Sequence, residues 1–268
     1  MFKSIQYVLK ENFSNLYRIF CIARYELLAD MRDSKFGLFW NFASPAIQVL
    51  TYWFVFGIAM NRRGYDGVDF LPWVVVGFAA WWYISPCITQ GCSAVFSKKN
   101  VITKMKFPIS VLPATVCLKE LFNHICMLAV TFIVLIICGY YPNIYWLNLI
   151  YYAFCAFMLV ETLSLVTSVL TMIWRDVKKL VVSLMRMLLY LSPVLWPAML
   201  QDIPIMTIIL KLNPIYYIVT GYRDAVFFHK SFLAHPALTL YFWVVIIVLL
   251  IIGSSLMYHF KRKMVDMI

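Results

Sequence analysis

Acidic residues are scarce in this sequence, and charge of either sign is uncommon. The 268 residues include 12 aspartates and glutamates against 23 lysines and arginines, and only 13% of the chain is charged. Hydrophobic residues make up 63%, and the mean hydropathy is +0.83. A soluble domain of this length cannot bury so much apolar surface. The composition therefore predicts a protein that uses a bilayer as its solvent.

Motifs for catalysis and nucleotide binding are also missing. None of the nine glycines opens a G-x-x-x-x-G-K-[ST] loop, the four histidines form no HExxH pair, and no G-x-S-x-G motif occurs. The seven cysteines show no CxxC spacing and lie mostly in or beside apolar segments, so we interpret them as packing residues. The N-terminal segment has no early continuous apolar core, so no cleavable signal peptide is expected. We expect a chain that is not an enzyme and has no catalytic residue, metal or cofactor of its own.

Long apolar runs are abundant in this sequence. They lack the alternation of polar and apolar residues that strands of a membrane barrel show, so the predicted fold class is an all-α membrane protein. A crossing helix needs about 20 apolar residues. We predict a single transmembrane domain over residues 1–268, with six spans near 37–60, 70–95, 109–139, 144–174, 177–197 and 238–260.

Two other segments are apolar but are not expected to cross the membrane. In residues 4–32, apolar side chains recur at helical spacing, which predicts an amphipathic interfacial helix; a plain membrane anchor is the alternative. Residues 203–228 are too apolar for a solvated loop and predict two short re-entrant helices in the outer leaflet; a loosely packed external loop is the alternative. Asn213 followed by Pro214 is a favourable helix start.

Basic residues are unevenly distributed along the chain. Most of the 23 lysines and arginines lie in the N-terminal segment, the loops after the second and fourth spans, and the C-terminal tail. Cytoplasmic loops of membrane proteins carry lysine and arginine in excess. The pattern predicts a multi-pass protein of the plasma (cytoplasmic) membrane with both termini in the cytosol. The net charge of +11 then reflects topology, and no nucleic acid partner is expected.

The loop after the second span brings four lysines together. If residues 98–106 are helical, three apolar side chains share one face and lysines surround them, while Pro108 pushes Phe107 out of the helical region. Such a short helix is suited to a groove on a soluble partner. A loop that binds anionic lipid headgroups is an equal alternative.

Four stretches, in order along nearly the whole chain, resemble type-2 ABC exporter permeases of the polysaccharide and teichoic acid export family. "RDSKFGLFWNFASPAIQVLTYWFVFG" (32–57) is similar to the junction of their interfacial helix and first span, and "KKNVITKMKFPISVLPA" (98–114) resembles their coupling helix. "WRDVKKLV" with "LLYLSPVLWP" (174–197) and "LNPIYYIVTGYRDAVF" (212–227) resemble their fifth span and outer re-entrant helices. The chain looks most similar to the membrane subunit of wall teichoic acid exporters.

This resemblance implies half of a homodimeric pore that works with two copies of a separate ATP-binding subunit, in which ATP and Mg²⁺ would bind. The implied substrate is a teichoic acid on an undecaprenyl-diphosphate carrier, moved from the cytosol to the outer face of the membrane. Export of capsular polysaccharide or O-antigen is the alternative, and an integral-membrane transferase acting on polyprenyl-linked sugars is a more remote one. The residues implied to couple to the ATPase are Lys98, Lys99, Asn100, Val101, Ile102, Lys104, Met105, Lys106 and Phe107.

Aromatic residues are common in the first two spans. Rings on a pore wall can stack on sugar faces and still allow sliding, because their contact is broad and weakly directional. An aromatic belt at the membrane interface is the alternative. The candidate substrate-pore residues are Trp40, Tyr52, Trp53, Phe56, Trp73, Phe78, Trp81, Trp82 and Tyr83.

Charged residues inside apolar helices need partners, because isolated charge in a bilayer is costly. We expect Arg186 to pair with Glu161 or Glu120 as a structural bridge. An enzyme would have to use one of these two acids as its catalyst. In the outer loop, Arg223 lies beside Asp224, so we expect local charge neutrality there rather than a guide for an anionic polymer.

Overall fold

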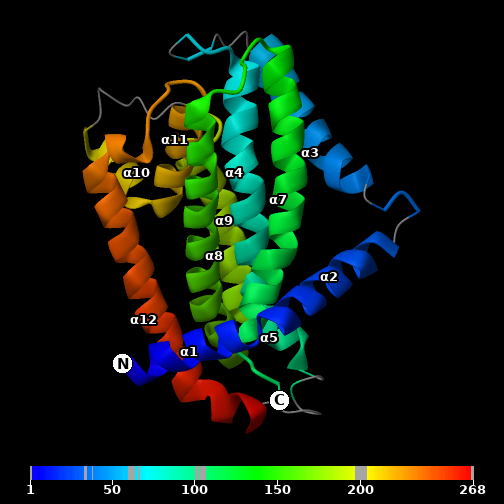
Figure 1. Ribbon diagram of the computed structural model, residues 1–268, viewed down its shortest axis with the longest axis vertical. Helices are drawn as coiled ribbons and strands as arrows, with labels where there is room; N and C mark the ends of the chain where they lie inside the picture. Colours follow the sequence, from blue (N-terminus) through cyan, green and yellow to red (C-terminus); the bar gives the residue numbers. More distant parts are fainter. Residues whose placement is uncertain are drawn as a thin grey trace.

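The computed structural model describes residues 2–32, 35–37, 39–59, 64–65, 67–99, 102, 107–196 and 204–266, without the side chains of 204–206 and 262–266. Within these ranges, all regular structure is helical except an isolated bridge between Tyr65 and Val68 (Figure 1). Five helices are long and apolar enough to cross a membrane: Phe39–Ala59, Phe70–Gly91, Val111–Ile137, Ile144–Ile173 and Pro236–Lys261. They confirm an α-helical, multi-pass membrane protein.

The centre of the bundle is α4 (Phe70–Gly91), which packs against α7 (Val111–Ile137) and α8 (Asn148–Ile173) (Figure 1). In the most apolar 18-residue window of α4, 78% of the residues are buried. The helix is apolar on all sides, as expected for a helix that protein surrounds. A short helix, α5 (Ala94–Ser97), follows it.

Two long helices lie at the periphery. The first predicted span is α3 (Phe39–Tyr52), continued by a π-helical segment, Trp53–Ala59; only 6% of its apolar window is buried. At the other side, α12 (Pro236–Asp266) packs along α8. Short 3-10 helices precede both, Ile144–Leu147 before α8 and Phe232–Ala234 before α12. The large apolar side chains that α3 leaves exposed require lipid or another protein surface.

The predicted interfacial helix is present as two helices, α1 (Phe2–Ser14) and α2 (Leu16–Arg32). Both run across the bundle rather than along it (Figure 1). They separate at Asn15, whose side-chain amide donates to the Glu11 carbonyl at 2.7 Å. Val8 and Ile19 face the bundle and are buried, whereas apolar side chains on the other face are exposed. This arrangement agrees with an amphipathic helix in the membrane interface.

The predicted span 177–197 is shorter than expected. Its helix, α9 (Asp176–Leu191), has 16 residues and is therefore only about 24 Å long. The helix ends because Pro193 favours an extended conformation at Ser192, which has φ −92° and ψ 149°. α9 is not among the five candidate spans, so the prediction of six full spans is supported for five of them.

Two short helices occupy the predicted re-entrant segment. They are α10 (Pro204–Leu212) and α11 (Pro214–Val226), and α11 is buried along most of its length. The predicted helix start is confirmed, because the Asn213 side chain accepts a hydrogen bond from the Ile215 amide at 3.0 Å. The Asn213 side-chain amide also donates to the Ser192 hydroxyl at 2.9 Å, which links α11 to the end of α9. That these helices dip into the outer leaflet stays a prediction.

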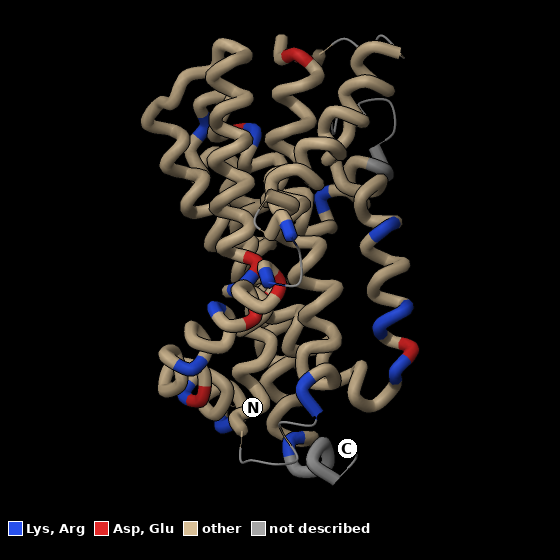
Figure 2. The backbone as a smooth tube through the Cα atoms, turned by 90° about the vertical axis from the view of Figure 1, so that its right-hand side faces the viewer, with Lys and Arg blue, Asp and Glu red and all other residues tan. Residues whose placement is uncertain are grey.

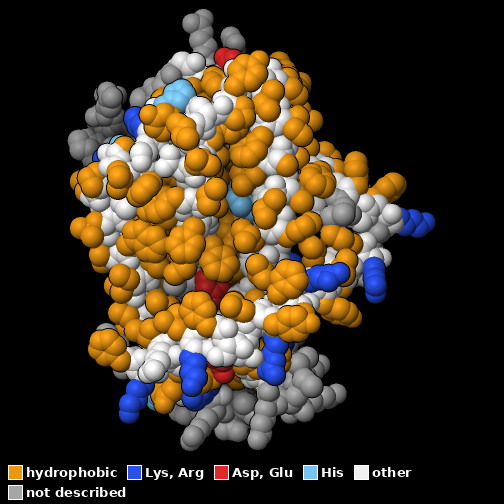
Figure 3. Space-filling view, in the orientation of Figure 1, with side chains coloured by type: hydrophobic (Ala, Val, Ile, Leu, Met, Phe, Trp, Pro, Cys, Tyr) orange, Lys and Arg blue, Asp and Glu red, His pale blue; other side chains and the backbone are white. Residues whose placement is uncertain are grey.

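Both chain termini lie at one end of the bundle, which we call the terminal end (Figure 1). Most of the lysines and arginines lie in this half of the molecule (Figure 2), while apolar side chains cover the bundle face above it (Figure 3). This distribution is compatible with the predicted cytosolic location of the termini, which stays a prediction.

Candidate functional site

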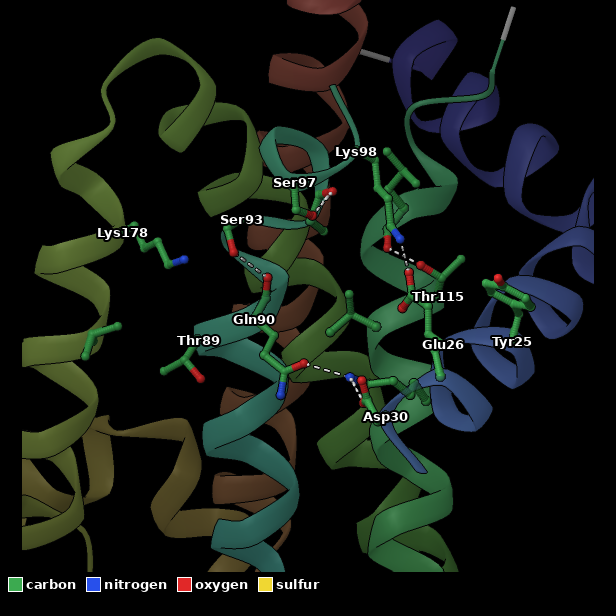
Figure 4. Close-up of a pocket in the computed structure, with 16 residues that line it drawn as sticks. Tyr25, Glu26, Asp30, Thr89, Gln90, Ser93, Ser97, Lys98, Thr115 and Lys178 are labelled. Atoms are coloured by element: carbon green, nitrogen blue, oxygen red, sulfur yellow. Dashed lines mark hydrogen bonds and ion pairs between the residues drawn. The ribbon is translucent and has the colours of Figure 1, made fainter. Parts of the chain in front are cut away.

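A polar cleft with a volume of 620 Å³ lies at the terminal end, between α2, α4, α5, α7 and α9 (Figure 4). It adjoins the lysine-rich loop that follows α5. We call it the polar cleft. Its polar lining residues are Tyr25, Glu26, Asp30, Thr89, Gln90, Ser93, Ser97, Lys98, Thr115, Lys119 and Lys178.

Lys119 of α7 is the centre of the cleft's hydrogen-bond network. Its ammonium nitrogen lies 3.1 Å from Asp30 Oδ2 of α2, 3.0 Å from Gln90 Oε1 of α4 and 3.4 Å from Glu120 Oε1. Only 10% of the Lys119 side chain and 6% of the Glu120 side chain are exposed, whereas Asp30 is open to water, so the contact with Glu120 is the more shielded of the two ion pairs. One ammonium thus joins the interfacial helix to two bundle helices.

Glu120 extends this network toward α3. Its carboxylate accepts hydrogen bonds from Gln90 Nε2 and Asn123 Nδ2, each at 3.0 Å. Asn123 in turn accepts one from Asn41 Nδ2 of α3 at 3.0 Å. Every one of these partners is a side chain, so the network can rearrange without breaking helical backbone hydrogen bonds.

The predicted pairing of Arg186 with Glu120 or Glu161 stays a prediction. Glu120 has Lys119 as its partner, and no ion pair in the described part of the chain joins Arg186 to Glu120 or Glu161. The buried face of α9 is marked by Val181 and Met185, and a helix turns by about 100° per residue. Arg186 therefore lies on another face of α9, and it is exposed.

Lys98 connects the lysine-rich loop to the interfacial helix. Its ammonium lies 2.6 Å from Glu26 Oε1 of α2, with 37% of the Lys98 side chain exposed. Across the cleft, Lys178 of α9 points toward the other lining residues (Figure 4) and has no ion pair with any described residue. Lys178 therefore provides uncompensated positive charge at the cleft.

The predicted coupling segment is described only in part. Lys98, Lys99, Ile102 and Phe107 are described; Asn100, Val101, Lys104, Met105 and Lys106 lie outside the described residues. Ile102 is buried, and Phe107 packs against the same apolar cluster, which includes Val8 of α1. The loop is thus attached to both halves of the interfacial helix, to α1 by apolar packing and to α2 by an ion pair.

The candidate pore aromatics separate into two groups. Trp73, Phe78, Trp81 and Tyr83 are buried within this single chain, so their rings contact protein here, and a pore role for them stays a prediction. The other five are partly or fully exposed, and a pore role for them stays a prediction: Trp40, Tyr52, Trp53, Phe56 and Trp82.

Stacked rings join α3 to α4. Phe78 stacks on Tyr52 and on Trp82, each with ring centroids 4.9 Å apart. Trp82 also donates its indole N–H to Gln48 Oε1 at 2.9 Å. These contacts hold the otherwise exposed α3 on the central helix.

The buried position of Arg223 and its contacts with backbone carbonyls were not predicted from the sequence. Its side chain is buried in α11, where it donates to the carbonyls of Pro193, Val194 (2.7 Å) and Trp73 (3.4 Å). The guanidinium also lies 4.0 Å from the centroid of the Trp73 ring. Asp224 does not pair with it but lies 3.2 Å from His235 and 3.8 Å from Lys230. Local neutrality therefore holds for Asp224, while Arg223 donates to backbone carbonyls through Nη1 and Nη2 and its buried Nε has no acceptor among the described residues.

Comparison with known proteins decides the family. Residues 17–227 match the family described as ABC-2 type transporter. The chain belongs to the ABC-2 type transporter family. ABC-2 permeases work with a separate ATP-binding subunit, so this ABC-2 permease is a transport subunit, as the sequence resemblance implied.

Three curated permeases are similar to the chain over most of its length. The O-antigen export system permease protein RfbA of Myxococcus xanthus is 26% identical over 89% of this chain and 90% of its own length. Two Klebsiella pneumoniae proteins with the same name are 22% identical (92% of this chain, 93% of that protein) and 23% identical (76% and 77%). This ABC-2 permease therefore spans nearly the full length of two of the three relatives.

Proposed function

We propose that this chain is the membrane subunit of an ATP-driven exporter of a lipid-linked polysaccharide of the O-antigen class. The three relatives carry the name of O-antigen export permeases, and two of them are covered over 90% and 93% of their own length. The sequence resemblance favoured teichoic acid first. The comparisons support its alternative, O-antigen, better, and we adopt that alternative.

The ion pair between Lys98 and Glu26 is the observation that carries the proposed mechanism. A separate ATP-binding subunit seats the loop that contains residues 98–107 in its cleft. When that subunit closes on ATP and Mg²⁺, the loop moves, and the 2.6 Å contact with Glu26 passes the movement to α2. The movement of α2 then reaches Lys119 of α7 through Asp30, and it reaches α4 through the contact between Lys119 and Gln90.

The functional assembly that we propose contains two copies of this chain and two ATP-binding subunits, with both termini of each chain in the cytosol. Support for a second copy comes from the peripheral helix, where Ile47 and Leu50 of α3 are exposed, as are Phe54 and Ile58 of the π-helical segment that continues it. The undecaprenyl-diphosphate carrier is anionic, and the uncompensated charge of Lys178 favours its approach to the terminal end. The polymer then moves to the outer face past the exposed rings of α3.

The proposal is tested by co-expression of the tagged chain with its ATP-binding subunit in a strain that lacks its own O-antigen exporter. We expect the two subunits to copurify, and O-antigen to reach the cell surface only when both are present. A matched strain that makes a teichoic acid on the same carrier distinguishes the two substrates. The proposal is wrong if no ATP-binding subunit copurifies, or if surface O-antigen does not depend on this chain.

A transferase makes a different prediction for the two membrane acids. Glu120 is already bound by Lys119, Gln90 and Asn123, which leaves it poorly placed as a general base. Under the transport proposal, Glu120→Gln and Glu161→Gln both retain measurable export. Loss of nearly all turnover in either variant, with normal amounts of folded protein, would favour the enzyme.

A further inference from the structure

A second, apolar cavity lies between the interfacial helix and the bundle. It has a volume of 270 Å³ and is bounded by α1, α2, α7, α8 and α12. Most of its lining is aliphatic or aromatic, for example Val8, Phe157 and Leu250, and it shares no lining residue with the polar cleft. We call this cavity the interfacial groove.

Two hydrogen-bond acceptors in the interfacial groove have no donor. Oε2 of Glu161 in α8 and Oδ1 of Asn12 in α1 are both buried, and no group in the described part of the chain donates to either atom. The orientation of the Asn12 amide is fixed, because its Nδ2 donates to the carbonyls of Val8 at 3.0 Å and Ser110 at 3.4 Å. Buried acceptors without donors are costly, so the groove fits a ligand that brings donors.

The negative charge of Glu161 limits the kinds of ligand that fit the interfacial groove. Glu161 is in the membrane-spanning part of α8 and forms no ion pair with any described residue. Its hydrogen-bond partner is the Cys117 thiol, and a carboxylate there without a counter-ion favours a cation. A primary ammonium carries positive charge and three N–H donors, enough for both acceptors. A quaternary ammonium has the charge but no N–H donor, and an anionic headgroup is repelled.

We propose that the interfacial groove binds a phospholipid with a primary-ammonium headgroup. The ammonium contacts Glu161 Oε2 and Asn12 Oδ1, and an acyl chain packs against the aliphatic lining. The level of α1 and α2 on the bundle, suited to the membrane interface, places the groove where headgroups meet acyl chains. An acidic patch within the apolar face above α1 is visible in Figure 3. This site is independent of the polymer that is exported.

The test uses the full-length protein in detergent with equimolar phosphatidylethanolamine and phosphatidylcholine that carry identical acyl chains. Native mass spectrometry counts the lipids that each molecule retains. We expect phosphatidylethanolamine to be retained about tenfold over phosphatidylcholine, since charge-assisted hydrogen bonds are lost with the quaternary headgroup. Equal retention overturns the proposal. Preference for phosphatidylglycerol in a parallel mixture also overturns it, because basic residues of α1 would then select the lipid.

Variants locate the site. Glu161→Gln keeps the shape of the side chain and removes its charge, and we expect the preference to fall to near unity. Asp176→Asn is the control, because it removes the same charge from an exposed side chain paired with Lys179, and it keeps the wild-type preference. If Glu161→Gln retains the preference, the groove is not the site. Asn12→Leu provides the second variant and is expected to lower the preference severalfold; the wild-type comparison alone remains decisive if neither variant folds.

Discussion

The two ends of this permease hold a largely buried cation in opposite ways. At the terminal end, Lys119 is bound by the side chains of Asp30, Gln90 and Glu120, from three helices. At the other end, Arg223 is bound by backbone carbonyls of Pro193, Val194 and Trp73, with no acid among its partners. Side-chain partners can exchange through rotamer changes, whereas carbonyls move only when the backbone moves.

This difference indicates that the two ends of the bundle have different mechanical roles. Arg223 joins the turn after α9 to α4 and α11, so we expect this end of the bundle to act as a rigid cap. Lys119 and Lys98 connect helices through side-chain contacts alone, so under the proposed function we expect the terminal end to transmit movement. Substitutions at Arg223 are expected to have the largest effect on stability, and substitutions in the polar cleft the most selective effect on export.

Replacing Arg223 with alanine is expected to have the largest effect. The change leaves three buried carbonyl acceptors without their donor and opens a cavity beside Trp73, which we expect to lower stability by about 3 kcal/mol or more. The thermal unfolding midpoint in detergent and the folded fraction after size exclusion measure it. Arg223→Lys retains the charge but not the planar fork, and is expected to recover only part of the loss. An Arg223→Ala protein as stable as wild type would contradict the rigid-cap interpretation.

Gly77→Ala is expected to destabilise the same cap by about 2 kcal/mol, because overpacking a close contact forces the backbone to shift. A Cβ at Gly77 would lie 2.5 Å from Arg223 Nη2 and 2.7 Å from the Val194 carbonyl oxygen. The unfolding midpoint measures the change. In an Arg223→Ala background the additional cost is expected to be smaller, since one of the two clashing atoms is gone. Full additivity of the two substitutions would show that they do not act on one contact.

At the terminal end, Lys119→Met is expected to cost less stability, about 1–2 kcal/mol, because Gln90 and Asn123 still satisfy part of Glu120. We expect export to fall severely although most of the protein stays folded, since the Lys119 contact between α2 and the bundle is lost. Surface polysaccharide and the unfolding midpoint, measured on the same preparations, separate the two effects. Lys119→Arg restores the charge and is expected to recover export in part. Normal export by Lys119→Met would remove the proposed transmission route.

Reversing charge at the half-buried Lys98–Glu26 pair is expected to change stability least, by about 1 kcal/mol. Each single change, Lys98→Glu or Glu26→Lys, is expected to uncouple ATP hydrolysis from export severalfold. The swapped double variant restores the pair with opposite polarity. Rescue by the swap, measured as export per ATP hydrolysed, supports transmission through this contact; no rescue means that Lys98 acts on another partner.

Hydropathy and capping predict much of this fold, and tertiary contacts account for what they miss. The span prediction 144–174 agrees with Ile144–Ile173, because apolar length alone decides where a helix can cross. The Asn213–Pro214 start is equally local. The end of α9 at Ser192 depends less on local sequence. The turn that follows it is held by Arg223, which is 30 residues from Pro193 in sequence.

The sequence predicted where the polar cleft lies but not which residues contact one another in it. Lysines around Lys98 mark the terminal end, but the partners of Lys119 come from residues 89 and 29 positions away, which no spacing rule links to it. Arg186 was assigned to the acids by its depth in the membrane alone. Depth does not determine which face of α9 packs against the bundle, and the packing leaves Arg186 exposed.

The π-helical segment Trp53–Ala59 gives the peripheral helix an adjustable register. A π turn holds about one residue more than an α turn, so its conversion to α-helix would rotate one half of this helix against the other by about 100°. Such a rotation exchanges the rings that the helix presents to its surroundings, while the stack of Tyr52 on Phe78 keeps the first half in place. Rotation about the helix axis at this segment would change which side chains of Trp53–Ala59 face lipid or a partner, while α3 stays packed on α4.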